Sequence, residues 1–190
     1  MNLYATMIDN WPYWIVTVFV IVAAYIDGKE LRVPNKLTFP MIIAGWVYSM
    51  IAYGLAGDGW YVGLGWSLAG TAVGLMTLLP AYSIGGMGAG DVKMMAAIGA
   101  WVHVTMTFYS FCIGTIVGAI LAVGMIVWSG QAKKHWNQFF FIANEIATVR
   151  NPEVLAGIAA ERKSSMQLLP YGIPLAIGTV MYFGWMGLLV

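Results

Sequence analysis

Long apolar runs separated by short polar segments dominate the pattern of this sequence. A helix needs about 20 apolar residues, with a range of about 17–25, to cross the hydrocarbon core of a bilayer. Runs of this kind predict membrane spans at 11–27, 37–55, 60–82 and 168–190. A further stretch, 94–128, contains no Lys, Arg, Asp or Glu. The pattern therefore predicts an all-α polytopic membrane protein.

The charge-free stretch 94–128 is too long for one span. As one straight helix it would measure about 52 Å at 1.5 Å per residue, against a hydrocarbon core of about 30 Å. We therefore expect a break near His103, Val104 and Thr105, with spans at 92–103 and 105–128. Six transmembrane helices in a single membrane-embedded domain, 1–190, result from this division.

A polar segment at 129–167 separates the fifth and sixth predicted spans. Its aromatic and aliphatic residues recur at roughly helical spacing among Lys, Gln, Asn and Glu, and Asn151-Pro152-Glu153 has the pattern of a second helix start. Basic and aromatic residues together favour an amphipathic helix in the headgroup region, although a solvated connector fits the same pattern. We place this segment on the cytoplasmic side.

The basic residues set the orientation of the predicted spans. With six spans, all nine fall on one side: Lys29, Arg32, Lys36, Lys93, Lys133, Lys134, Arg150, Arg162 and Lys163. Asp9, Asp58 and His103 fall on the other side. The positive-inside rule makes the basic side cytoplasmic and places both termini outside. Because residues 1–10 hold no basic residue, we expect the first run to be retained rather than cleaved as a signal peptide.

Composition supports a bilayer as the solvent and excludes several classes of protein. Hydrophobic residues make up 61% of the chain and charged residues 9%, with a mean hydropathy of +0.79. A net charge of +1 from scattered Lys and Arg does not predict nucleic-acid binding. The single cysteine, Cys112, excludes an internal disulfide or a four-cysteine zinc site, and its apolar surroundings indicate a small packing residue.

Two acids stand out because a charge in a membrane segment is costly and indicates function. Asp27 ends the first apolar run, and Asp91 begins the fourth, after a glycine-rich segment at 85–90. The predicted topology puts both at the cytoplasmic edge. Taken singly, Asp27 could be a boundary residue that reaches water, and Asp91 could be a helix N-cap. The absence of a Gly-Lys-Ser/Thr ending argues against a phosphate-binding loop.

At this point the residues carry a family resemblance. Gly88-Ala89-Gly90-Asp91 fits the GxGD motif of intramembrane aspartyl proteases, and its extension through Val92-Lys93 resembles the version in prepilin peptidases. Asp27 with the downstream Val33-Pro34-Asn35 resembles the family's first aspartate and its Ile/Val-Pro-Asn segment. Pro170-Tyr171-Gly172 resembles the family's Pro-Tyr-Gly stretch in the last helix. The resemblance spans most of the chain in the same order.

The resemblance implies that Asp27 and Asp91 are the catalytic residues of an aspartyl endopeptidase. Two carboxyls at one site share a proton, so that the ionised one activates a water and the protonated one donates to the scissile carbonyl oxygen. The individual roles stay unassigned because the pair titrates as a unit. No metal or other cofactor is expected. Substrate-binding or supporting roles are expected for Gly88, Gly90, Lys93, Pro34, Asn35, Pro170 and Tyr171.

These supporting residues also have simpler interpretations. Gly88 and Gly90 would admit a close backbone or substrate strand. Lys93 would modulate the pair or merely mark the membrane edge, and Pro34-Asn35 would shape the site or form a plain turn. Pro170 and Pro174 would leave backbone groups open for substrate or simply kink the last helix.

The implied substrates are prepilin or pseudopilin precursors, cut between a short basic leader and a hydrophobic helix at the cytoplasmic face of a bacterial inner membrane. The chain lacks the tetracysteine zinc site and length of the members with N-methyltransferase activity, so it resembles the short branch associated with Flp-type, tight-adherence pili. Methylation is therefore not expected. Membrane lipid and pilus assembly proteins are further expected partners, and nucleic acid is not.

Other classes of protein share part of this pattern. A small transporter or channel can carry an acid pair on its pathway, but it needs polar groups deep in both halves of the membrane. A non-catalytic pilus or secretion assembly factor would tolerate Asp→Asn at both positions. Within the proteases, preflagellin peptidases and presenilin-like enzymes remain open. Presenilin-like enzymes carry a tyrosine directly before the first aspartate, whereas Ile26 stands there in this chain and Tyr25 lies one position earlier.

Overall fold

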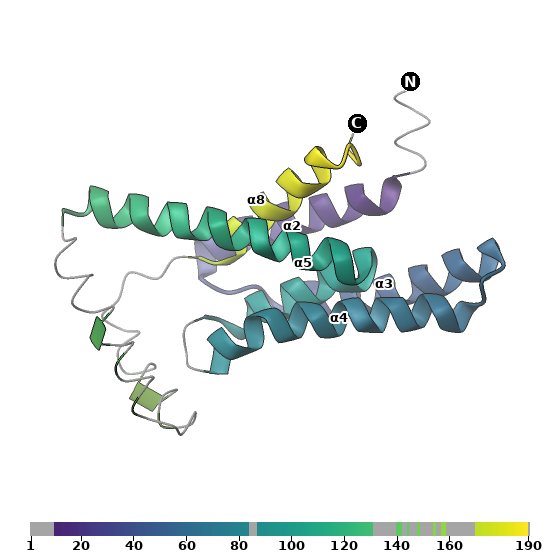
Figure 1. Cartoon of the computed structure of the whole chain (residues 1–190), viewed down its shortest axis with the longest axis horizontal. Coiled ribbons are helices and arrows are strands. Elements are labelled where there is room, and N and C mark those ends of the chain that lie inside the picture. Colours follow the sequence, from purple (N-terminus) through teal and green to yellow (C-terminus); the bar gives the residue numbers. More distant parts are fainter. Residues whose placement is uncertain are drawn as a thin grey trace.

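The computed structural model describes residues 10–83, 87–130 and 170–189, with isolated positions at 140, 141, 144, 148, 154, 157 and 158. These residues form helices α2 (Trp11–Glu30), α3 (Asn35–Ala56), α4 (Trp60–Ser83), α5 (Ala89–Trp128) and α8 (Gly172–Trp185), shown in Figure 1. The expected all-helical class is confirmed for this part of the chain. The first four helices are long and apolar enough to cross a membrane, and α8 is a shorter apolar helix.

Several helix ends differ from the predicted spans. Helix α2 continues to Glu30, so Asp27 lies within its last turn and not at its end. The helix stops at Leu31, whose left-handed backbone (φ 52°) lets its N–H donate to the Asp27 carbonyl. Helix α8 begins after Pro170 and ends well before the predicted 190. Pro174 is its third residue, where the missing N–H has no intrahelical partner to lose.

The predicted cytoplasmic segment at 129–167 lies outside the described residues, apart from 129–130 and the isolated positions. The same is true of residues 1–9 and of Gly85-Gly86 in the glycine-rich segment. The predictions made for these parts of the chain stay predictions.

Helix α5 is interrupted at His103, the residue near which the sequence predicted a break. His103 has φ 61° and ψ −167°, a backbone region that is essentially restricted to glycine. Figure 1 shows the consequence: the first half of α5 lies with α3 and α4, and the second half runs back alongside α2 and α8. The break therefore reverses the chain within one apolar stretch.

Close glycine contacts hold each half of α5 to its own neighbours. A Cβ on Gly70 of α4 would lie 2.1 Å from the carbonyl oxygen of Gly99 in the first half. A Cβ on Gly178 of α8 would lie 2.3 Å from the amide nitrogen of Gly114 in the second half. Small residues allow such backbone contact, which is how helices associate in a solvent as apolar as leucine. We call α3, α4 and residues 89–102 the α3–α4 unit, and α2, α8 and residues 104–128 the α2–α8 unit.

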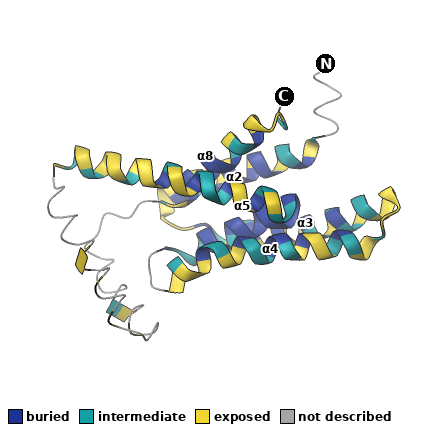
Figure 2. Cartoon of the chain, viewed as in Figure 1, coloured by how far each residue is buried: buried dark blue, intermediate teal, exposed yellow. Residues whose placement is uncertain are grey.

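The distribution of polar and apolar residues suits a bilayer. Large apolar side chains cover the outside, with Leu55 85% exposed, whereas Ser49 and Ser67 are fully buried (Figure 2). The buried hydroxyls tie helices together: Ser67 donates to the Ala100 carbonyl, and Ser49 lies 3.1 Å from His103 Nε2. The described helices therefore fit a multi-pass membrane protein in which hydrogen bonds and small residues hold the interior.

Candidate active site

Asp27 is buried in the last turn of α2 and accepts a hydrogen bond from a distant helix. The N–H of Gly172 donates to Asp27 Oδ2 with an N···O distance of 2.8 Å. Gly172 is the first residue of α8, so its N–H belongs to the group that has no partner within the helix. The positive end of the α8 dipole also favours a negative carboxylate there. Helix α8 therefore both orients Asp27 and stabilises its charge.

Gly172 is a site residue that the sequence argument did not assign, although its neighbours Pro170 and Tyr171 were expected to have supporting roles. A Cβ at Gly172 would lie 2.8 Å from Asp27 Oδ2, so any larger residue would press on the carboxyl. The carbonyls of Pro170 and Tyr171 accept the first hydrogen bonds of α8, so the backbone of these two residues acts locally. A glycine at the start of a proline-flanked helix was the available signal.

Asp91 is buried as the third residue of α5, after Gly88 at the N-cap. Gly88 has extended backbone (φ −83°, ψ 148°), and a Cβ placed on it would lie 3.4 Å from Asp91 Oδ2. The carboxyl is therefore folded back over the start of its own helix, where a negative charge is stabilised. Each of the two acids thus lies at the N-terminus of a helix, Asp27 at α8 and Asp91 at α5.

Gly90 brings the first turn of α5 against the link that follows Asp27. A Cβ on Gly90 would lie 2.7 Å from the Val33 nitrogen and 2.8 Å from the Val33 oxygen. Val33 is buried and stands six residues after Asp27, in the link 31–34 between α2 and α3. Both acids therefore lie at the end of the bundle where α2 finishes and α5 begins, and the close backbone approach at Gly90 involves the chain itself.

Lys93 joins the same turn of α5 to the start of α3. Its Nζ donates to Asn35 Oδ1 at 2.8 Å and lies 5.0 Å from the centroid of the Phe39 ring. Asn35 is the first residue of α3, and Pro34 is its extended N-cap. Supporting roles were predicted for Lys93, Pro34 and Asn35 independently of one another. The structure brings these three residues together beside Gly90 and Asp91.

The two acids belong to different helix groups. Asp27 is part of the α2–α8 unit and Asp91 is part of the α3–α4 unit. The link 31–34 and the break at His103 connect the two units along the chain. A reaction that needs both carboxyls therefore depends on how the two units pack against each other at this end.

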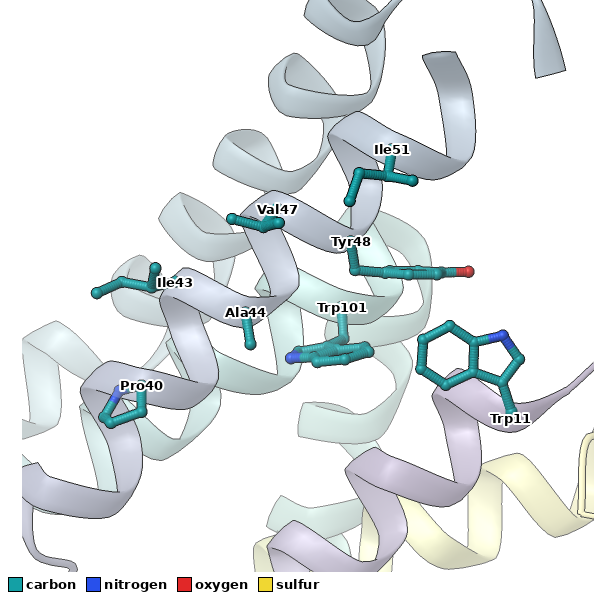
Figure 3. Close-up of a pocket in the computed structure, with 8 residues that line it drawn as sticks. All are labelled: Trp11, Pro40, Ile43, Ala44, Val47, Tyr48, Ile51 and Trp101. Carbon is teal, nitrogen blue, oxygen red and sulfur yellow. The ribbon is translucent and has the colours of Figure 1, made fainter. Parts of the chain in front are cut away.

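An apolar groove lies away from the carboxyls, and its chemistry is different. It has a volume of about 690 Å³ and lies between Trp11 of α2, one stripe of α3 and Trp101 of α5 (Figure 3). The Tyr48 ring stacks on Trp101 with centroids 5.1 Å apart, and the Trp11 ring meets Tyr48 edge-on at 5.0 Å. The Tyr48 hydroxyl is the most reactive group in this lining, so the groove offers no acid, thiol or imidazole for catalysis.

Comparisons with known proteins find the same family that the sequence motifs resemble. Residues 14–123, which include Asp27 and Asp91, match the model of the type IV leader peptidase family. A prepilin leader peptidase/N-methyltransferase of Aeromonas salmonicida is 28% identical over 120 residues, covering 60% of this chain and 39% of that protein. The Neisseria gonorrhoeae protein of the same name is 29% identical over 124 residues, covering 62% and 41%.

A third relative of that name, from Bacillus subtilis, is 26% identical over 136 residues, covering 69% of this chain and 51% of the relative. The chain thus matches about two fifths to one half of the length of these curated relatives. No solved structure matches the chain.

Proposed function

The chain belongs to the type IV leader peptidase family, and we propose that it is an intramembrane aspartyl endopeptidase that removes the short basic leader from type IV prepilins. One observation supports this most directly: two buried aspartates, each at a helix N-terminus, lie at the same end of the bundle. Burial of a carboxylate in an apolar protein costs free energy, so a buried pair of this kind indicates a function. This pair has the chemistry of an acid–base dyad.

The proposed reaction needs one proton shared between Asp27 and Asp91. The ionised carboxyl removes a proton from a water as the water oxygen attacks the scissile carbonyl carbon, and the protonated carboxyl donates to the carbonyl oxygen. The tetrahedral intermediate then collapses, a proton passes to the peptide nitrogen, and the C–N bond breaks. The products are a leader with a new carboxyl end and a mature subunit with a new amino end.

The neighbouring groups support this chemistry by holding the carboxyls in place. The Gly172 N–H fixes one oxygen of Asp27, and the contact of Gly90 with Val33 sets the position of the turn that carries Asp91. The hydrogen bond from Lys93 to Asn35 ties the start of α3 to that turn. Of these contacts, the Gly172 N–H meets Asp27 directly, and the other two join the segments that stand next to Asp91 and after Asp27 in the chain.

We further propose six spans, with the acids at the cytoplasmic face of a bacterial inner membrane. In this proposal the break at His103 divides α5 into two spans, which together with α2, α3, α4 and α8 make six. Lys29, Arg32 and Lys36 lie at the end of the bundle that carries the acids, which the positive-inside rule makes cytoplasmic. An enzyme placed this way would meet a leader before it leaves the cytoplasm.

The proposed substrates are Flp-type prepilins or pseudopilins. Each would present a basic leader in the cytoplasm and an apolar helix in the bilayer, so the bond between them would reach the depth of the acids. Only peptidase activity is proposed for this chain, although the matched relatives carry both activities in their names. Lipid and proteins of the pilus assembly machinery would be its other contacts.

A cleavage assay tests the proposal. The chain is co-expressed with an Flp-type prepilin, and the leader is followed by gel shift and mass spectrometry beside Asp27→Asn and Asp91→Asn. Both substitutions keep the shape of the side chain and remove its acid–base function, so each is expected to abolish cleavage. Asp58→Asn is the matched control, because Asp58 is an exposed acid in the loop between α3 and α4.

Membrane fractions confirm that all forms are inserted in equal amounts. Cleavage that persists in both Asp27→Asn and Asp91→Asn would rule out the dyad. A wild-type chain that cleaves no prepilin of this class, although it is correctly inserted, would favour the transporter interpretation instead.

A further inference from the structure

The apolar groove is open on one side, unlike the interior of either helix unit. Along α3 it follows a stripe of residues from Pro40 to Ile51, on which Ile43 is 54% exposed and Val47 is 48% exposed. Trp11 of α2 and Trp101 of α5 complete the lining, and Figure 3 shows their rings beside this stripe. The lining therefore comes from both the α2–α8 unit and the α3–α4 unit, and an occupant would touch both.

The groove begins close to the level of Asp91. The contacts that Gly90 and Lys93 make with the link 31–34 and with the first residue of α3 put the start of α3 at that level. Pro40 lies about 8 Å further along the helix, and Ile51 lies about 16 Å beyond Pro40. The groove thus covers the part of α3 that follows the acid end of the bundle.

Helix α2 gives the same distance from the other side. Trp11 meets Tyr48 with ring centroids 5.0 Å apart, near the far end of the groove. Asp27 follows Trp11 in the same helix, about 24 Å away along its axis. Because the link 31–34 joins α2 to α3 at the acid end, the acids and the aromatic rings lie at opposite ends of this pair of helices.

The size of the groove suits an apolar helix that is partly embedded in it. Spread over about 16 Å of α3, its volume of about 690 Å³ corresponds to a mean cross-section of about 40 Å². A helix about 10–12 Å across has roughly twice that section, so about half of it would lie in the groove. Ala44 stands in the middle of the stripe, where a small residue permits the close approach by which helices associate in a bilayer.

The chemistry of the lining also favours a helix over an extended peptide. The indole N–H of Trp101 already donates to the Met41 carbonyl, with an N···O distance of 2.9 Å. The other polar side-chain atoms of the lining belong to Trp11 and Tyr48 at the far end. An extended peptide would lose water from its backbone groups along the groove without gaining partners, whereas a helix pairs its own N–H and C=O groups.

We propose that this groove binds the apolar helix of the precursor, the part that follows the scissile bond. The inference rests on the proposed function and names the docking surface for its substrate. In the proposed orientation, α3 and the precursor helix both run outward from the cytoplasmic face. A precursor helix parallel to α3 then has its first turns at the level of the acids and its following turns in the groove. Docking of the helix sets the depth at which the scissile bond is held.

Cysteine crosslinking in membranes tests the position of the precursor helix. The chain carries Val47→Cys with Cys112→Ser, and Asp27→Asn keeps the precursor intact. An Flp-type prepilin carries single cysteines along its apolar helix, and a copper–phenanthroline oxidant forms the disulfides. Leu68→Cys is the matched control. Leu68 is 43% exposed on α4, outside the groove lining, at a depth similar to that of Val47 because Gly63 of α4 packs against Ser49 of α3.

We expect Val47→Cys to crosslink at positions centred about 12 residues after the scissile bond. Val47 lies about 18 Å along α3 from the level of Asp91, which is the length of about 12 helical residues. The crosslinked positions should recur every three or four residues, because one face of the precursor helix enters the groove. Leu68→Cys should give no such pattern.

A kinetic measurement with purified full-length enzyme tests the same surface. Ala44→Trp fills the groove, and we expect it to raise KM for the prepilin about tenfold while kcat stays within about twofold of wild type, because binding is lost without a change at the acids. Ala119→Trp is the control, since Ala119 is exposed on the second half of α5, outside the groove lining. Its KM should match that of the wild type.

Three results would overturn the inference while leaving the peptidase intact. Equal crosslinking of Val47→Cys and Leu68→Cys, together with equal KM values for Ala44→Trp and Ala119→Trp, would leave lipid as the occupant. Crosslinks between two chains at Val47→Cys would mean that a second copy covers the groove. Crosslinks to the precursor without helical spacing would exclude a docked helix. Failure of the proposed function is distinguishable, because the wild type would then not cleave, or Asp27→Asn would cleave equally well.

Discussion

Asp27 and Asp91 are both placed at helix N-termini, but by different means. Asp91 belongs to the helix whose start it occupies, and Gly88 and Gly90 beside it leave room for the carboxyl and for Val33. Asp27 stands near the C-terminal end of its own helix, where its charge is disfavoured, and the start of α8 compensates for this. Within the described part of the chain, the hydrogen bond that compensates the Asp27 charge comes from Gly172.

Replacement of Gly172 by alanine tests this dependence. The new methyl group would lie 2.8 Å from Asp27 Oδ2, so either the carboxyl or the start of α8 must move. A displacement of about 1 Å in a reacting group can cost about 100-fold in rate, and we expect a loss of that order in the initial rate of leader cleavage. The measurement uses equal amounts of purified variant and wild-type enzyme.

Gly184→Ala is the control for this change. Gly184 lies in the same helix, and a Cβ there would have no atom within 4 Å, so its cleavage rate should match that of wild type. If Gly172→Ala cleaved as fast as Gly184→Ala, the contact between α8 and Asp27 would have no catalytic importance.

These residues also show how far the sequence could predict the site. The position of Asp91 at the start of a helix could be predicted, because the glycines and the acid lie within a few residues of one another, in the motif at 88–91. The Gly172–Asp27 contact joins positions 145 apart, and no local pattern predicts which N–H an acid will meet. The pairing of Lys93 with Asn35 was missed for the same reason, although both residues were named.

At the scale of elements, α5 shows which part of the fold is encoded by length and which by contacts. A charge-free stretch longer than a bilayer requires a break, so the break could be predicted. The residue at which the helix breaks could not be predicted. Gly99 is the nearby residue best suited to a positive φ, but it stays helical because its backbone packs against Gly70. His103 takes the strained conformation instead and is held by Ser49.

A comparison of His103→Gly with His103→Ala tests this strain. Both variants lose the imidazole and its contact with Ser49, but only glycine relieves the backbone. Strain of roughly 1–3 kcal/mol, less roughly 0.4–1 kcal/mol for the greater freedom of glycine in the unfolded chain, leaves His103→Gly about 1 kcal/mol more stable than His103→Ala. Reversible unfolding in mixed detergent–lipid micelles gives this difference. Equal stability of the two variants, or a more stable alanine variant, would mean that the break is not strained.

At the scale of the whole molecule, the helices that the structure describes form two units, and the proposed site lies where they meet. Composition predicted a membrane protein, and the apolar runs predicted most of its helices, because both depend on the solvent. The division into two units was not predictable, because it depends on which glycines find each other: Gly70 with Gly99 in one unit, and Gly114 with Gly178 in the other. One acid in each unit makes the catalytic geometry a property of the assembled molecule.

The orientation of this assembly in the membrane can be measured with single cysteines in a Cys112→Ser background. Arg32 is exposed beside the acids, and Asp58 is exposed in the loop between α3 and α4. If the acids face the cytoplasm, a membrane-impermeant maleimide added to intact cells labels Asp58→Cys, and it labels Arg32→Cys only after the inner membrane is opened. The reverse pattern would place both acids outside, where a leader still in the cytoplasm could not reach them, and the proposed substrate would have to be abandoned even if the dyad itself were intact.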